Sequence, residues 1–329
     1  MNFSEMESEN STTTNAPFLF TIIPIPVRFW IYLIADILSV LCSLFVLYYL
    51  LFDRTLRQAL NNHVIIVLLL AGLIYELTTV PLMLYYFQFY DTWQISATFS
   101  RFWSFIDYTC YTIQMIGIAW ASIERHILIF NSTWLVTQRK RFLWHYLPLI
   151  IICIYCIAFE TVYVLYPWCG DTYGYSPING VPVHCPYVDP EMALWDTFLH
   201  QIIPTVTVIV FSLALLFRVL KQQAQFRRST NGSKHRKLTI QLLSITSVYL
   251  LFNFPRSIIQ IFIFTGSPTN ELQDAYYSNL FFSVCIVFFL PFICYGSTPG
   301  LNQKLNKLFC HANRLHPTIV PENELVQRT

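Results

Sequence analysis

Charged residues are scarce in this 329-residue chain, in which Asp, Glu, Lys and Arg together make up 12%. That is about half of the ~25% found in ordinary soluble domains. Basic and acidic residues nearly balance, with 20 Lys and Arg against 18 Asp and Glu, so the basic excess needed for nucleic-acid binding is absent. Hydrophobic residues reach 55% and mean hydropathy is +0.50, which excludes a disordered chain. So many hydrophobic residues with so few charged ones predict a polytopic membrane protein.

Several sequence patterns are also missing. Strands with a two-residue alternation do not appear, which argues against an outer-membrane barrel. The apolar segments contain neither a His-x-x-x-His nor a Gly-x-Ser-x-Gly motif, so we expect no enzyme activity, metal site or cofactor. The chain does not start with basic residues followed by an apolar run, so no cleavable signal peptide is predicted.

Seven segments are long and apolar enough to cross a bilayer core of ~30 Å, which takes ~20 residues of helix. They lie near residues 29–52, 63–87, 101–123, 143–165, 196–219, 238–264 and 276–298. The third has the lowest hydropathy because it contains Asp107, Thr109, Thr112 and Gln114, so its polar face should look into a helix bundle. The predicted fold is all-α, a seven-transmembrane helix bundle.

Positive charge marks one side of this bundle. Of the 20 Lys and Arg residues, 17 follow spans one, three and five or lie in the tail, and the exceptions are Arg28, Arg101 and Arg256. The positive-inside rule places those segments in the cytoplasm, with the N-terminus outside and the C-terminus inside. The predicted regions are an extracellular tail (1–28), the seven-transmembrane domain (29–298), and a short amphipathic eighth helix with a cytoplasmic tail (299–329).

This topology suggests three kinds of covalent modification. The N-terminal tail contains glycosylation sequons at Asn2 and Asn10. Cys169 and Cys185 lie 16 positions apart in the outside segment 166–195, an oxidising environment. We predict a disulfide within this loop, the alternative being two free thiols. Cys310 ends a short amphipathic stretch after the seventh span and is a candidate for palmitoylation, the alternative being an unmodified thiol.

Ionisable residues inside membrane spans are costly and often functional. Asp107 lies about two turns into span three, Glu76 lies in the outer half of span two, and Arg256 lies in the outer half of span six. We predict that they converge, with Asn253, on a cavity that binds a polar ligand. The alternative is mutual neutralisation, in which Asp107 or Glu76 pairs with Arg256 as a structural contact, and the two interpretations can coexist.

The inner end of span three carries Glu124-Arg125-His126, with Ser122 three residues before the arginine. Together with seven spans and an outside N-terminus, this motif resembles that of the rhodopsin-like (class A) G-protein-coupled receptors, which have Asp/Glu-Arg-Tyr there. The resemblance implies a resting Glu124–Arg125 pair, and an arginine that turns toward a helix of an incoming heterotrimeric G protein on activation. A guanidinium near the membrane surface needs such a carboxylate or carbonyl partner.

Prolines within the spans extend the resemblance. Pro204, Pro255 and Pro291 stand where the family has prolines in spans five, six and seven, and Tyr295 follows Pro291 by four residues. A proline within a helix leaves carbonyls unbonded and kinks the helix. The resemblance therefore implies switching hinges at Pro255 and Pro291, with Tyr295 as part of the switch.

Some positions depart from the family pattern. Gly72 stands in place of the sodium-binding Asp, Asn253 in place of the span-six Trp, and Leu290 in place of the Asn before the span-seven proline. These changes put sodium regulation and the usual rotamer switch in question. Ser100 replaces the span-three cysteine, so the family's usual disulfide to the outer loop cannot form, which strengthens the case for Cys169–Cys185.

The sequence thus predicts a G-protein-coupled receptor of the plasma membrane. It would bind an extracellular ligand, a peptide or other small polar molecule, and activate heterotrimeric G proteins through the end of span three. An amine ligand is a further alternative, because amine receptors of the family have their ligand-binding Asp at the position of Asp107. The competing hypotheses are a transporter or channel, which the lack of internal symmetry disfavours, and a receptor-like protein that does not signal.

Overall fold

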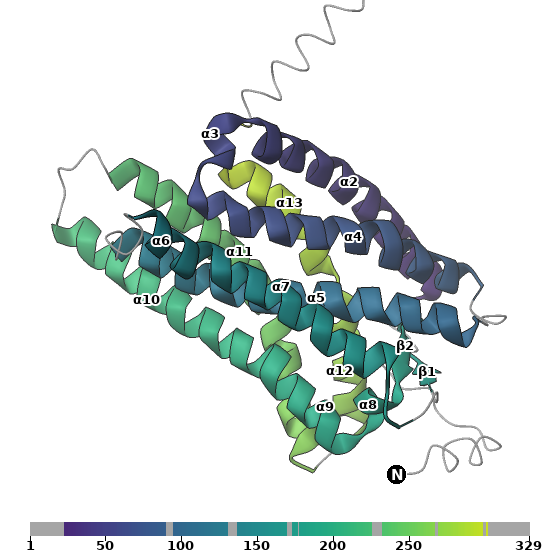
Figure 1. The fold of residues 1–329 in the computed structure, drawn as a ribbon. Coiled ribbons are helices and arrows are strands. Elements are labelled where there is room, and N and C mark those ends of the chain that lie inside the picture. The colour runs from purple at the N-terminus through teal and green to yellow at the C-terminus, as the bar shows by residue number, and fades with distance from the viewer. Residues whose placement is uncertain are drawn as a thin grey trace, which may run out of the picture.

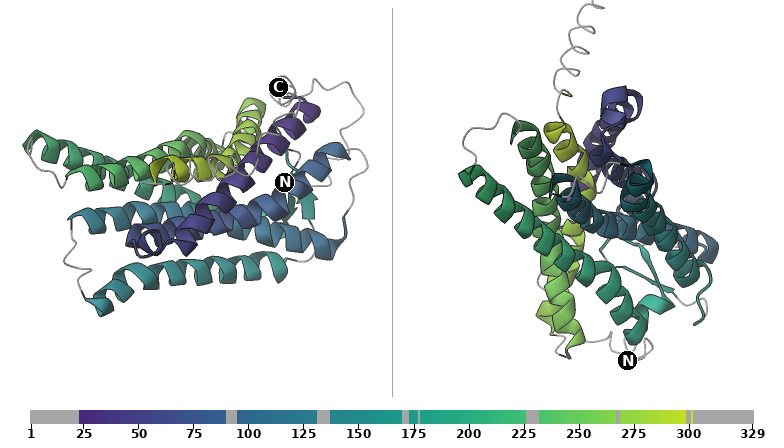
Figure 2. Two further views of the ribbon diagram at one scale, coloured as in Figure 1. Left: turned by 90° about the horizontal axis from the view of Figure 1, so that it is seen from above. Right: turned by 60° about the vertical axis from the view of Figure 1, so that its left-hand side comes forward.

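The computed structural model describes residues 23–89, 95–130, 137–169, 173–176, 178–225, 232–266, 269–298 and 301. Within them, long helices run alongside one another and a two-stranded sheet lies at one end (Figures 1 and 2). We call this the hairpin end, and the end that carries the short helices α3 (Arg54–Arg57) and α6 (Gln138–Arg141) the opposite end. The predicted sites Asn2, Asn10 and Cys310, and residues 302–329 of the predicted tail, lie outside the described residues.

The first half of the chain supplies four of the spanning segments. They are α2 (Ile25–Phe52), α4 (Leu60–Gln88), α5 (Ala97–Phe130) and a continuous run of α6, η3 (Phe142–Tyr146), α7 (Leu147–Glu160) and η4 (Thr161–Leu165). The segments η3 and η4 are π-helical turns, in which the backbone bonds reach one residue further than in an α-helix.

The second half begins with the hairpin and supplies three more spanning segments. Its elements are β1 (Tyr173–Tyr175), β2 (Pro182–His184), α8 (Cys185–Val188), α9 (Pro190–Thr197), η5 (Phe198–Ile202), α10 (Ile203–Gln225), α11 (Gly232–Phe264), α12 (Asn270–Ser283) and α13 (Cys285–Ser297). The run from α9 to α10 is one continuous helical segment, and α12 continues into α13 after a single turn residue, Val284.

Six of the seven segments are long and apolar enough to cross a membrane by length and composition. They are Ile25–Phe52, Asn62–Gln88, Gln138–Leu165, Pro190–Arg218, Leu243–Phe264 and Glu271–Ser297. The seventh, α5, has 34 residues but carries the polar side chains that lower its hydropathy. Those at Asp107, Thr109, Thr112 and Gln114 are all buried, and α5 packs against α4, α7, α10 and α11. This confirms the seven-helix bundle and the inward polar face of the third span.

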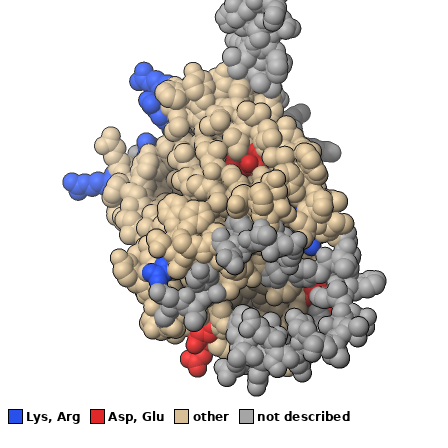
Figure 3. Space-filling view, turned by 90° about the vertical axis from the view of Figure 1, so that its right-hand side faces the viewer, with Lys and Arg blue, Asp and Glu red and all other residues tan. Residues whose placement is uncertain are grey.

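The outer surface of the bundle is apolar because lipid, rather than water, is its solvent. On α2 the side chains of Trp30, Leu41 and Phe52 are exposed, whereas Asp36 and Ser39 are buried. This is the reverse of a helix in a soluble protein. On the face drawn in Figure 3, the described surface is mostly free of charge, and Lys, Arg, Asp and Glu appear at a few scattered places.

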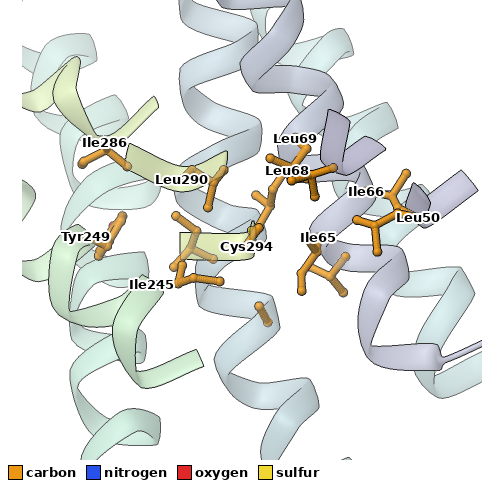
Figure 4. Close-up of a cluster of buried hydrophobic side chains, with 14 of the residues drawn as sticks. Leu50, Ile65, Ile66, Leu68, Leu69, Ile245, Tyr249, Ile286, Leu290 and Cys294 are labelled. Atoms are coloured by element: carbon orange, nitrogen blue, oxygen red, sulfur yellow. The ribbon is translucent and has the colours of Figure 1, made fainter. Parts of the chain in front are cut away.

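A hydrophobic cluster joins the helices in the middle of the bundle. Its side chains come from α2, α4, α11 and α13, among others (Figure 4). The members labelled there are Leu50, Ile65, Ile66, Leu68, Leu69, Ile245, Tyr249, Ile286, Leu290 and Cys294. Close packing of this kind is what holds helices together in lipid, where the hydrophobic effect between helices is weak.

The hairpin lies over the bundle and is closed by a disulfide. Antiparallel β1 and β2 pair with Tyr175 opposite Pro182, and a bond between Cys169 and Cys185 joins the segments that flank them. The structure thus contains the disulfide that the sequence predicts. Both cysteines lie in the segment between the fourth and fifth spans, with Cys185 at the start of the short helix α8, so this bond does not attach the hairpin to a spanning helix.

Two other contacts attach the hairpin to the helices. Ser104 of α5 donates a hydrogen bond to the carbonyl oxygen of Pro182 over 2.8 Å. Gly180 has a φ of 73° and lies against Tyr86 of α4, so that an added Cβ would be 2.3 Å from the Tyr86 Cγ. Glycine is required here both by the left-handed backbone and by the close approach of the ring.

Candidate ligand-binding site

A cavity of about 580 Å³ lies inside the bundle toward the hairpin end. Residues of α5, α11 and α12 form much of its wall, and residues of β1, β2, α8 and α9 also line it. This volume falls within the range of ~300–1,000 Å³ that is typical of small-molecule sites. Of the predicted pocket residues, Asp107, Asn253 and Arg256 line this cavity.

Six buried polar atoms in the cavity lining have no hydrogen-bond partner among the described residues. They are Asp107 Oδ1, Gln114 Nε2, Ser176 Oγ, Asn253 Nδ2, Arg256 Nε and Gln260 Oε1. Leaving one buried donor or acceptor unsatisfied costs roughly 1–3 kcal/mol, and more when the group is charged. Such atoms cluster where a ligand or ordered water completes the bonding.

Arg256 is held in the cavity by tyrosines. Its Nη1 donates to the Tyr111 hydroxyl over 3.1 Å. Its guanidinium lies 5.2 Å from the ring centre of Tyr111 and 5.7 Å from that of Tyr276. The Tyr111 hydroxyl in turn lies 3.4 Å from Asn253 Oδ1. Cation–π contacts orient a guanidinium without neutralising its charge, so Arg256 stays available to an anion.

Glu160, at the end of α7, is a second cavity carboxylate and is well bonded. Thr112 donates to its Oε1 over 3.1 Å, and Tyr187 of α8 donates to its Oε2 over 2.6 Å. The Tyr187 ring stacks on Tyr108 with ring centres 4.3 Å apart. Burial, and next the Glu160 carboxylate, raise the pKa of Tyr187 well above its usual value. Tyr187 therefore remains a neutral donor that ties the hairpin loop to α7.

Asp196 of α9 is a third carboxylate in the lining, and it contacts His200 of η5. Asp196 Oδ1 lies 2.6 Å from His200 Nδ1, and His200 Nε2 lies 2.8 Å from the Tyr155 hydroxyl of α7. The two residues are four apart, so one turn of helix brings their side chains together. This chain of contacts links the start of the fifth span to the fourth.

Glu76 lies apart from the cavity lining. Its carboxylate accepts hydrogen bonds from Ser39 and Ser43 of α2, the second over 3.2 Å. Ser39 also donates to the Phe288 carbonyl of α13 over 3.1 Å. Glu76 therefore joins α4 to α2, and Ser39 extends the contact to α13. The structure brings Asp107, Asn253 and Arg256 to one cavity and places Glu76 outside its lining, and the ligand-binding role of these residues remains a prediction.

At the opposite end of α5, Glu124 contacts a histidine of the fourth span. Its Oε1 lies against His145 Nδ1, and His145 Nε2 lies 2.9 Å from His63 Nδ1 of α4. Glu124 and His145 are both buried. This Glu124 cluster (Glu124, His145 and His63) joins α5, η3 and α4. The pair implied for Glu124 was with Arg125, and the structure adds His145 as a partner.

The remaining predicted switch residues lie on α5, α11 and α13. Arg125 is buried, and the His126 ring packs edge-on against Phe211 of α10, with ring centres 5.7 Å apart. Pro255 lies inside α11 and Pro291 inside α13. Tyr295 contacts Phe45 of α2, with ring centres 5.9 Å apart. Their roles in switching remain predictions.

Several site residues were missed from the sequence. Glu160 lies within the fourth predicted span, where an ionisable residue is unusual, but the tyrosines that surround the charges gave no sequence signal in a chain with 20 tyrosines. The sequence places His63 and His145 at the ends of two predicted spans, but it does not show that they touch. Within the described residues, no group of three or more His, Cys, Asp or Glu side chains is arranged to hold a metal ion.

Comparison with known proteins agrees with this geometry. The family model described as 7 transmembrane receptor (rhodopsin family) matches residues 43–295. Among solved structures, the crystal structure of squid rhodopsin is similar, with a TM-score of 0.70 and 17% sequence identity, covering 92% of this chain and 91% of that chain. At this identity the likeness shows the fold alone. No curated protein matches the sequence.

Proposed function

Because this chain belongs to the rhodopsin family of seven-transmembrane receptors, we propose that it binds an extracellular ligand and activates heterotrimeric G proteins. The ligand is a peptide or another small polar molecule, and the receptor acts in the plasma membrane. The excess of Lys and Arg in the connections at the opposite end supports an orientation with the hairpin end outside and the opposite end in the cytoplasm.

The observation that carries this proposal is that one helix, α5, both lines the cavity and carries Arg125 toward the opposite end of the bundle. Asp107 has an unpartnered oxygen in the cavity lining, and Arg125 lies 18 residues further along the same helix. At 1.5 Å per residue, about 27 Å separates them along the helix axis. A ligand at the hairpin end and a protein partner at the opposite end can therefore act on one rigid element.

Ligand binding would favour one of two arrangements of the helices. A ligand shifts such an equilibrium only by as much as its affinity for the two arrangements differs. Arg256 and Asn253 of α11 line the cavity, and Pro255 lies between them in the same helix. A change at the cavity wall would thus act next to a proline kink, a common place for helices to bend. Arg125 would then become accessible to a G-protein helix.

One structural feature favours a second candidate, a receptor-like protein that does not signal. Glu124 is held by His145, which also contacts His63, so the end of α5 is tied to two neighbouring helices. If this contact persists when ligand binds, the Arg125 end would not open. The departures at Asn253 and Leu290 point in the same direction, because both replace residues of the family's usual switch.

A ligand screen in cells distinguishes these candidates. Cells expressing the full chain are exposed to a library of peptides and small polar molecules, with a panel of chimeric G proteins as readout. We expect at least one ligand to give concentration-dependent G-protein activation that untransfected cells lack. A ligand that binds but activates no member of the panel would instead support the silent receptor. Ligand-dependent uptake or current in proteoliposomes would indicate a transporter or channel.

A further inference from the structure

The charges in the cavity lining differ in how far the protein itself satisfies them. Glu160 receives hydrogen bonds from Thr112 and Tyr187, and Asp196 contacts His200. Asp107, in contrast, has an oxygen with no hydrogen-bond partner among the described residues. Tyr75 hydrogen-bonds to Asp107, but of these three carboxylates Asp107 is the one with a buried oxygen that the described residues leave unsatisfied.

Among the described residues that line the cavity, Arg256 is the one Lys or Arg. The contacts that the structure gives it are with tyrosine, through the Tyr111 hydroxyl and the faces of Tyr111 and Tyr276. Its Nε lacks a hydrogen-bond partner among the described residues. Within that part of the chain, neither Arg256 nor Asp107 forms an ion pair with the other or with a third residue. The two charges attract each other across the cavity but are not joined in an ion pair, so each can still contact an opposite charge on a ligand.

We propose that the ligand is a small zwitterion, an amino acid or short peptide with a free ammonium and a free carboxylate. Its ammonium binds Asp107 on α5, and its carboxylate binds Arg256 on α11. A ligand of this class satisfies both charges at once, whereas a simple amine leaves Arg256 buried without an anion. An acid alone leaves Asp107 without a cation, and a buried unpaired charge is strongly unfavourable.

The uncharged part of the lining fits the same ligand class. The side-chain amides of Gln114, Asn253 and Gln260 each leave one atom without a partner among the described residues, and amides complement the peptide groups of a short peptide. The rings of Tyr108, Tyr111 and Tyr276 offer apolar faces to a side chain. A volume of about 580 Å³ accommodates a molecule of this size.

This inference rests on the proposed function, because it assigns the ligand class of the same cavity. It is tested by a binding readout that needs no G protein. The purified full chain in lipid nanodiscs is melted in the presence of the 20 amino acids and of a set of dipeptides that covers them. Each compound that raises the melting temperature is compared with its C-terminal amide, which keeps the cation, and its N-acetyl form, which keeps the anion.

We expect at least one zwitterion to stabilise the protein, and its amide and N-acetyl forms to bind at least tenfold more weakly. In Asp107→Asn, the free and N-acetyl forms should bind alike, and in Arg256→Gln the free and amide forms should bind alike. Glu191→Gln and Arg101→Gln alter charges outside the cavity lining and should retain both preferences.

Two results would overturn the assignment. One is a panel in which no zwitterion stabilises the protein, and the other is a single-charge form that binds as tightly as the zwitterion. Both results are measured on the wild-type chain, so they remain decisive even if a variant fails to fold. A zwitterion that binds with the expected preferences but activates no G protein would leave the ligand class intact and contradict the proposed signalling function.

Discussion

Asp107 and Glu124 are buried carboxylates on the same helix, α5, but their surroundings differ. Glu124 contacts His145, which reaches on to His63, so protein groups from two neighbouring helices satisfy it. Asp107 has an oxygen in the cavity lining with no partner in the described part of the chain. A carboxylate satisfied by the protein holds helices together, whereas one left unsatisfied implies a group from outside.

The largest loss of stability is expected when Glu124, the carboxylate that the protein satisfies, loses its partner. His145→Ala leaves the buried Glu124 carboxyl without its histidine partner, and leaving a buried charged group unsatisfied costs upward of about 3 kcal/mol. The thermal stability of the purified protein measures the loss. His63→Ala is the matched control, because His63 contacts His145 rather than Glu124, and about 1 kcal/mol is expected for one hydrogen bond. Equal losses in the two variants would mean that Glu124 does not depend on His145.

A somewhat smaller loss of stability is expected at Gly180, through which the hairpin packs against Tyr86 of α4. Gly180→Ala forces a left-handed backbone on a residue with a Cβ, which costs about 1–2 kcal/mol, and drives that Cβ into Tyr86, which adds about 1–3 kcal/mol. The same melting experiment measures it. At Gly266 φ is 100° but no atom of the described residues lies within 4 Å of an added Cβ, so Gly266→Ala should show the backbone cost alone. If Gly266→Ala proved as harmful, the contact with Tyr86 would not matter.

The smallest effects are expected from two conservative changes within the cavity, and they should differ in sign. Asp107→Asn removes a charge that lacks a full set of partners, so the ligand-free protein should become more stable by about 1 kcal/mol. Glu160→Gln places an amide donor against one of two hydroxyl donors, Thr112 or Tyr187, and should lower stability by about 1–2 kcal/mol. The melting temperatures of both variants, measured without ligand and compared with that of the wild type, test this difference in sign. A loss in both would show that Asp107 is a structural residue like Glu160.

Much of the fold could be predicted because membrane spans are recognised in a sequence by their length and apolarity. The helices found include the seven predicted spans, and α5 was correctly identified as the polar one. The disulfide was also predictable, since Cys169 and Cys185 share one loop. The register of the π-helical turn η3, which carries the buried His145, left no pattern in the sequence. The contact of His145 with Glu124 could therefore not be foreseen.

The position of Glu76 shows why the site was harder to predict than the spans. Tyr75 lines the cavity, and each residue of an α-helix is rotated about 100° from the one before it. Glu76 is therefore turned away, toward Ser39 and Ser43 of α2. Depth in the membrane can be read from the sequence of one span, but the rotation of a helix depends on the helices packed against it.

The most direct test of the proposed receptor mechanism is the substitution Arg125→Ala, measured with a ligand found by the screen. We predict that the variant reaches the cell surface and still binds the ligand, but that G-protein activation falls by more than tenfold. Arg139→Ala, at an exposed position of α6, is the control and should still activate. If Arg125→Ala bound ligand and activated G proteins as the wild type does, the role assigned to the Arg125 end of α5 would be wrong.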